Sequence, residues 1–167
     1  IAVANGTSMA DVDFGFVHDF GARDEFAASR GHGATLNGHP VATGGPDAGL
    51  EVVGLESAEP SWIRGAVEAL EGKAYRLRSV GSIAITLAYV ASRRFDAMLS
   101  ARRCRSVDAA AAQLIVRETG GFVEFVGLQL EEADLGLDAR YAIAAAREPE
   151  HLATVRAAQD ATFPPSE

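Results

Sequence analysis

The sequence has a single cysteine, Cys104, among its 167 residues. One cysteine excludes an internal disulfide framework and is compatible with a reducing compartment. No apolar run approaches the ~20 residues that a membrane-spanning helix needs. A secretory leader is not visible, although a missing N-terminal segment would hide one. We therefore expect a cytoplasmic protein that has no membrane partner.

Basic residues are fewer than acidic residues. The chain has 15 Lys and Arg against 23 Asp and Glu, which gives a formal net charge of −8. This balance disfavours binding to nucleic acid or to an anionic membrane surface. The hydrophobic fraction of 48% and the charged fraction of 23% are typical of a globular protein that buries a real core.

The order of predicted elements indicates an α/β layered sandwich. Strands are predicted over residues 1–5, 12–18, 25–29 and 34–36, with a turn at Asn37 and Gly38, and they form antiparallel hairpins. From residue 50 onward, predicted helices at 61–70, 82–92, 106–119 and 148–159 alternate with strands at 50–55, 74–77, 95–99, 122–126 and 141–145. Residues 43–49 and 129–138 have loop composition. We expect a first subdomain over 1–45, a second over 46–160 and a frayed tail over 161–167.

Two predicted helices are apolar on nearly all sides, which is typical of helices buried between layers. One begins after Ser82, and the other runs from Ser106, which we expect to be its N-cap, to Gly120 and Gly121. The second carries Asp108 in its first turn. Asp is favoured there in any helix through the helix dipole, but a rigid helix end also suits a carboxylate that holds a cation.

Four ordered segments give the chain a resemblance to a known family. Residues 106–121 read S-V-D-A-A-A-A-Q-L-I-V-R-E-T-G-G, residues 31–40 read G-H-G-A-T-L-N-G-H-P, residues 78–84 read R-S-V-G-S-I-A, and residues 95–97 read F-D-A. In this order they resemble the inositol monophosphatase family, whose corresponding motifs are W-D-x-A-A-G with E-A-G-G, G-x-G-A-x-x-N-G, R-S-x-G-S-A-A and R-x-D-G. The resemblance covers residues 1 to about 146.

The resemblance implies an α-β-α-β-α sandwich and magnesium-dependent hydrolysis of a phosphate monoester of inositol or a related sugar. In this family, metal ions stabilise both the attacking and the leaving oxygen. Asp108 matches a family metal ligand that also lies close to a substrate hydroxyl. Gly81, Ser82 and Ile83 match a segment whose backbone approaches the substrate, although a strand-to-helix turn alone would explain Gly81 and Ser82. Family members are often homodimers.

The strongest family motif, D-P-x-D-G-T, and its upstream glutamate are not in this sequence. We therefore expect the C-terminal portion of an enzyme that is inert by itself, because one carboxylate does not form a magnesium site. We also expect an unpaired strand edge and an uncovered apolar face near Ile1, Val3 and Phe14.

The segment before Asp108 departs from the family pattern. Ala101 stands where inositol phosphatases commonly carry a glutamate, and Val107 replaces the tryptophan of W-D. The segment is basic instead, with Arg102, Arg103 and Arg105. Guanidinium groups match phosphate, so these arginines suit a second phosphate on the substrate. A solvated basic loop is the alternative reading.

Other chemistry is less well supported. Cys104 lies among the arginines, which could lower its pKa, but no histidine base is near it in sequence. His18, His32 and His39 lack ligand-like spacing, so we expect surface or packing roles. Two alternatives to an inositol phosphatase remain: a fructose-1,6-bisphosphatase-like or nucleotide-bisphosphate phosphatase, and a non-catalytic binding module that keeps the fold.

Overall fold

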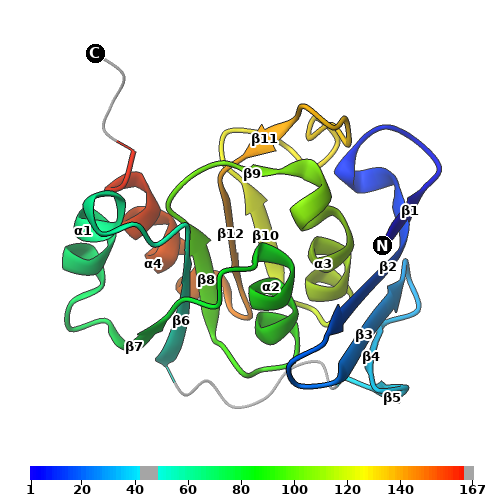
Figure 1. Cartoon of the computed structure of the whole chain (residues 1–167), viewed down its shortest axis with the longest axis horizontal. Helices are drawn as coiled ribbons and strands as arrows, with labels where there is room; N and C mark the ends of the chain where they lie inside the picture. Colours follow the sequence, from blue (N-terminus) through cyan, green and yellow to red (C-terminus); the bar gives the residue numbers. More distant parts are fainter. Residues whose placement is uncertain (42–48, 164–167) are drawn as a thin grey trace.

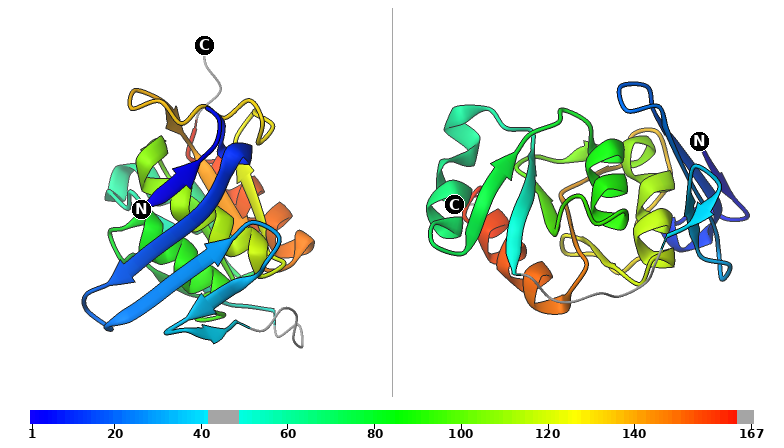
Figure 2. Two further views of the ribbon diagram at one scale, coloured as in Figure 1. Left: turned by 90° about the vertical axis from the view of Figure 1, so that its right-hand side faces the viewer. Right: turned by 90° about the horizontal axis from the view of Figure 1, so that it is seen from below.

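The structure is a computed structural model that describes residues 1–41 and 49–163. Of the predicted loop, residues 43–48 lie outside this part of the chain, as do the subdomain boundary after residue 45 and tail residues 164–167. The described elements form four layers in the order helices, sheet, helices, sheet (Figure 1; Figure 2, right). The predicted α/β layered fold is confirmed.

The first sheet is antiparallel and follows chain order. It contains β1 (Ala2–Ala4), β2 (Val12–Asp19), β3 (Asp24–Ser29), β4 (Ala34–Leu36) and β5 (His39–Pro40). The four predicted strands are confirmed, whereas β5 and the 3-10 turn η1 (Met9–Asp11) were not predicted. Asn37 and Gly38 have φ angles of 53° and 78°, as the turn between β4 and β5 requires.

The second sheet has the order β10-β12-β8-β6-β7. Its parallel strands are β6 (Leu50–Glu56), β7 (Ala74–Arg78) and β8 (Ala97–Ser100), and its antiparallel strands are β10 (Phe122–Phe125) and β12 (Ile143–Ala146). A separate ribbon pairs β9 (Cys104–Arg105) with β11 (Arg140–Tyr141). The strand predicted over 141–145 is therefore divided, with its first residue in the ribbon and most of the others in the sheet.

Within residues 1–41 and 49–163, four α-helices cover these sheets. Helices α1 (Pro60–Leu70) and α4 (Pro149–Asp160) lie on the outer face of the second sheet, and α2 (Ile83–Ala91) and α3 (Ser106–Glu118) lie between the two sheets (Figure 2). Every residue of α3 from Ala109 to Val116 is buried, which confirms the expectation from its apolar sequence. No helix of the described residues is long and apolar enough to cross a bilayer.

The predicted N-cap of α3 is wrong by one residue. Arg105 occupies the cap position and Ser106 is the first helical residue. The Ser106 hydroxyl lies 2.7 Å from the carbonyl oxygen of Gly136 and 3.2 Å from that of Leu135, and it donates toward them. A tertiary contact with the 129–138 loop therefore takes the hydroxyl that the sequence pattern assigned to the helix end.

The outer face of the first sheet carries no helix among the described residues. β1 is an edge strand, with Ile1 80% exposed and Val3 53% exposed, and Phe14 on β2 is 37% exposed. These values confirm the predicted open edge and uncovered apolar surface.

Gly15 on β2 packs directly against the backbone of α3. A Cβ atom built at Gly15 would lie 2.4 Å from the carbonyl oxygen of Ala111. Real Cβ atoms essentially never come this near to a backbone atom, so only glycine allows β2 to lie this close to the helix.

Replacing Gly15 with alanine is therefore expected to push β2 away from α3. Overpacking of this kind lowers the free energy of unfolding by about 1–3 kcal/mol. Urea denaturation of the 167-residue chain measures the effect. Gly21→Ala is the matched control, because a Cβ there meets only the Asp19 carboxylate, at 3.2 Å. Equal stabilities for the two variants would contradict the proposed tight contact.

Candidate active site

The predicted site residues follow the carboxyl ends of the parallel strands. The segment containing Gly81 and Ser82 follows β7, whereas the arginine segment and the start of α3 follow β8. Ligand sites of open α/β sheets lie at this edge, because the connections after adjacent parallel strands meet there. Both α2 and α3 begin near this edge (Figure 1).

The turn before α2 is held by a buried carboxylate. Glu56, at the end of β6, is 2% exposed and accepts the N–H groups of Val80 and Gly81 at 3.0 Å each. It also accepts the Thr86 hydroxyl at 2.6 Å. Ser82 is the N-cap, as predicted, and its hydroxyl oxygen accepts the N–H of Ile85 at 3.3 Å.

Asp108 lies in the first turn of α3 and faces Arg105. Its two oxygens accept Nη2 of Arg105 at 3.0 Å and Nε at 3.1 Å, and one of them also accepts the Arg105 N–H at 3.3 Å. The side chains are 34% and 58% exposed. An ion pair this exposed contributes little to stability, so a stronger cationic ligand can displace the guanidinium from the carboxylate.

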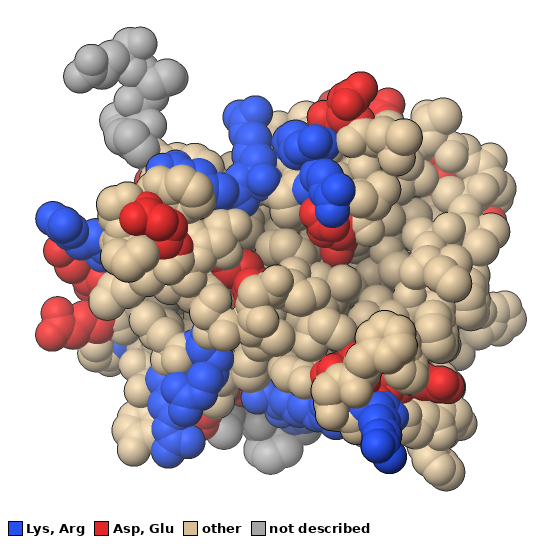
Figure 3. Space-filling model, viewed as in Figure 1, with Lys and Arg blue, Asp and Glu red and all other residues tan. Residues whose placement is uncertain are grey.

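The three arginines before Asp108 do not point to one place. The guanidinium of Arg102 lies 4.5 Å from the ring centre of Trp62 on α1, whereas Arg105 pairs with Asp108. Arg103 lines a pocket of about 440 Å³ together with Arg140 of β11, Asp160 of α4 and Phe163. In the space-filling view of Figure 3, basic and acidic side chains lie side by side along the upper edge of the molecule. The face turned to the viewer is hollowed below them.

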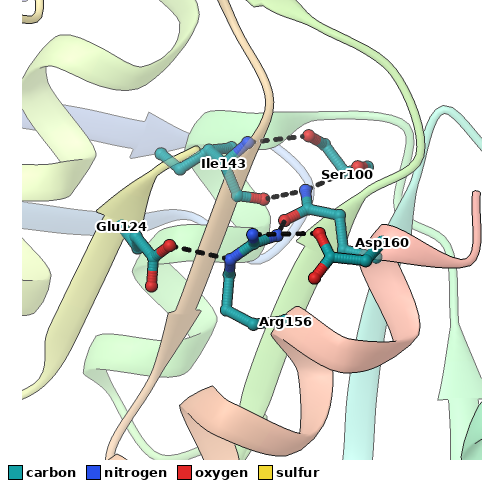
Figure 4. A network of polar contacts seen from close by, with 6 residues as sticks. Ser100, Glu124, Ile143, Arg156 and Asp160 are labelled. Carbon is teal, nitrogen blue, oxygen red and sulfur yellow. Dashed lines mark hydrogen bonds and ion pairs between the residues drawn. The ribbon is translucent and has the colours of Figure 1, made fainter. Parts of the chain in front are cut away.

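The end of β8, where the arginine segment starts, is fixed by a polar network with α4 (Figure 4). Buried Gln159 donates from Nε2 to the carbonyl oxygens of Ser100 at 2.8 Å and Ile143 at 3.0 Å. Arg156 in turn donates to the Gln159 side-chain oxygen at 2.6 Å and to Glu124 at 2.8 Å. These bonds hold Ser100 against β12, so the segment that follows has a defined origin.

Cys104 is not a reactive thiol. It is 8% exposed and lies on β9 opposite Tyr141. Burial, together with the negative charge of Asp108, raises the pKa of its thiol to about 12. The net effect is a raised pKa, which contradicts the possibility that the neighbouring arginines lower it and leaves catalytic thiol chemistry without support.

The described residues do not by themselves form a metal centre. Nowhere in ranges 1–41 and 49–163 do three or more His, Cys, Asp or Glu side chains come together in a way that could hold a metal ion. His32 and His39 are exposed, and His18 packs its ring edge-on against Phe20 with 4.5 Å between ring centres. Asp108, whose nearest charged partner is Arg105, does not fit a magnesium site alone, since Mg²⁺ needs near-octahedral oxygen coordination.

A sequence model described as the inositol monophosphatase family matches residues 2–161. The chain belongs to this family. A "Fructose-1,6-bisphosphatase/inositol-1-monophosphatase" of Thermococcus kodakarensis is 35% identical over 111 residues, which are 66% of this chain and 41% of that protein. A "Nus factor SuhB" of Xylella fastidiosa is 36% identical over 116 residues, covering 65% of this chain and 42% of that protein.

Solved structures agree with the family assignment. A hypothetical protein from Pyrococcus horikoshii, described as having similarities to inositol-1 monophosphatase, superimposes with a TM-score of 0.75 at 25% identity. The match covers 89% of this chain and 57% of that one. The matched residues make up less than half the length of the curated relatives. Some of these relatives are named as phosphatases and others as a Nus factor, so the names alone do not decide between an enzyme and a binding protein.

The sequence did not lead us to two residues, Glu56 and Arg140, that lie at the carboxyl-terminal edge of the second sheet or beside the arginine segment. Glu56 follows the apolar run of residues 52–55 at the end of β6, and that signal could have identified it, because a buried strand rarely ends in an unpaired carboxylate. Arg140 gave no such signal, since its place beside the arginine segment depends on the pairing of β11 with β9.

The raised pKa of Cys104 predicts slow alkylation. At pH 8, a thiol with a pKa of about 12 is ionised in roughly one molecule in ten thousand. Iodoacetamide should therefore modify the folded chain at least about a hundredfold more slowly than the urea-unfolded chain. The control carries Ser61→Cys in a Cys104→Ser background, and its exposed thiol should react at an ordinary rate. Equal rates for Cys104 and Cys introduced at Ser61 would contradict the buried, neutral thiol.

Proposed function

We propose that the whole protein hydrolyses a phosphate monoester of inositol or a related sugar with magnesium, and that Asp108 is one of its metal ligands. The observation that carries this proposal is the position of Asp108. A rigid helix with a buried body presents this carboxylate at the edge of the sheet where the parallel strands β7 and β8 end. In sequence, Asp108 also matches the aspartate of the family's W-D motif.

The remaining metal ligands would come from a D-P-x-D-G-T segment. One carboxylate supplies one or two of about six ligand positions. When bound, the metals would stabilise the negative charge on the attacking and leaving oxygens. Arg105 holds Asp108 in place, and the exposure of this ion pair leaves the carboxylate available for exchange with a cation.

The substrate class extends to bisphosphates. Gly81, Ser82 and Ile83 would bind the substrate through their backbone. Of the three arginines predicted at its non-reacting end, Arg102 stacks on Trp62 and Arg105 pairs with Asp108, which leaves Arg103 for that role. Arg103 is the best candidate for a second phosphate, because it lines the 440 Å³ pocket with a further guanidinium, that of Arg140. The Thermococcus relative, named for both fructose-1,6-bisphosphate and inositol-1-phosphate, supports this breadth.

A second candidate is a non-catalytic binding role. One observation favours it: the Xylella relative is named as a Nus factor. Such a protein would keep the fold and its anchored loops but would not turn over phosphate esters under any metal supply.

A chimera tests the enzyme. An N-terminal segment of a family member that contains D-P-x-D-G-T is fused before Ile1, and phosphate release from inositol-1-phosphate is measured with magnesium. We expect turnover in the chimera and none in the 167-residue chain alone, because this chain lacks the other ligands. Asp108→Asn should keep the circular dichroism spectrum and lower kcat by about 10²–10³.

Asp138→Asn is the matched control, since Asp138 is an exposed carboxylate on a loop. Near-normal turnover in Asp108→Asn would remove Asp108 from the metal site. An inactive but folded chimera would favour the binding role instead.

Substitutions of the arginines distinguish a bisphosphate substrate from a monophosphate substrate. Arg103→Ala should raise KM for fructose-1,6-bisphosphate about ten- to a hundredfold with little change for inositol-1-phosphate, because only the bisphosphate has a second charged group to lose. Arg105→Ala should affect both substrates, since it contacts Asp108 directly. The same loss with both substrates in Arg103→Ala would instead support the reading of a solvated basic loop.

A further inference from the structure

Glu56 has an environment that is unusual for a glutamate. It is 2% exposed, yet its partners are two backbone N–H groups of an exposed turn and the buried Thr86 hydroxyl rather than a cation. Val80 is 43% exposed and Gly81 is also exposed, so water alone could satisfy their N–H groups. Burying a carboxylate is costly unless it is fully hydrogen-bonded. We therefore expect Glu56 to have a role beyond accepting the N–H groups of Val80 and Gly81.

The donors that converge on Glu56 select a carboxylate over any other side chain. One oxygen accepts Val80 N–H and the Thr86 hydroxyl, and the other accepts Gly81 N–H. An ionised carboxylate has only acceptors, whereas glutamine would direct its NH₂ group at one of these donors. The start of α2 adds a favourable helix dipole for the negative charge.

Glu56 also connects the two segments of the candidate site. Its side chain binds the turn after β7, and its carbonyl oxygen accepts the N–H of Ala101 at 2.8 Å. Ala101 is the residue immediately before the arginines, so one residue at the end of β6 fixes the start of both segments. Gly54 helps, because a Cβ there would lie 2.4 Å from the Thr86 methyl group and would separate α2 from β6.

We propose that Glu56 is a positioning residue that holds the backbone of Gly81, Ser82 and Ile83 for the substrate, an inference that rests on the proposed phosphatase function. Glu56 fixes the N–H groups of Val80 and Gly81, and the Ser82 hydroxyl fixes that of Ile85. The N–H groups of Ser82 and Ile83 lie between these two anchored points and keep a single orientation.

The chain offers a matched control in Glu118, at the end of α3. Its two oxygens accept the N–H groups of Gly31 at 2.9 Å and Gly33 at 2.8 Å. This is the same arrangement, a carboxylate that bridges two N–H groups of a glycine-containing turn, but it ties α3 to the turn between β3 and β4. A substitution at Glu118 therefore reproduces the chemistry at another place.

The first measurement is amide hydrogen exchange by NMR on the 167-residue chain. Glu56→Gln should speed exchange at Val80 and Gly81 by about tenfold or more, because one N–H faces an NH₂ group in place of an oxygen. Core amides of α3 should stay within about twofold. Glu118→Gln should change exchange at Gly31 and Gly33 and leave Val80 and Gly81 as they are. Unchanged exchange at Val80 and Gly81 in Glu56→Gln would overturn the anchoring.

The second measurement is steady-state kinetics in the chimera described above. Glu56→Gln should raise KM for inositol-1-phosphate by about tenfold and change kcat by less than about threefold, since the metal site is untouched. Glu118→Gln should leave both parameters near normal. An unchanged KM in Glu56→Gln would overturn the substrate role, while an inactive parent chimera would overturn the phosphatase function itself and the exchange data would still decide the anchoring.

Discussion

The burial of α3 over residues 109–116 is the constraint on which the rest of the structure depends. A helix segment enclosed by two sheets and a neighbouring helix must be apolar on nearly all sides. Residues 109–116 are apolar except for Gln113, which is buried and donates to the Met9 carbonyl oxygen. The same enclosure requires Gly15 on the strand that lies against it. Polar chemistry is then possible only at the helix ends, where Asp108 and Glu118 stand.

Much of the fold could be predicted because its signals are local. Helices that are apolar on nearly every side and strands separated by glycine turns are readable from neighbouring residues. The ribbon of β9 and β11 was not predictable, because its two-residue strands have little pattern and their partners are distant in sequence. The prediction of Ser106 as the N-cap was wrong for a related reason. Its hydroxyl donates to carbonyl groups of the 129–138 loop, which is distant in sequence.

In the candidate site, too, local sequence signals predicted some positions, whereas contacts distant in sequence determine the others. Asp108 and Ser82 could be placed because a helix start fixes where they stand. The directions of the arginines could not, because each guanidinium is placed by a partner from another element: Trp62 for Arg102 and Asp108 for Arg105. Long side chains on a short loop take their orientation from such contacts.

The stacking of Arg102 on Trp62 also has a spectroscopic consequence. Trp62 is the single tryptophan of the sequence, it is 39% exposed, and the cation above its ring belongs to the segment that leads into α3. Indole emission responds to nearby charge and to water, and here only one indole contributes. The molecule therefore carries a native optical label beside its candidate site, and rearrangement of that segment can be followed in time without attaching a dye.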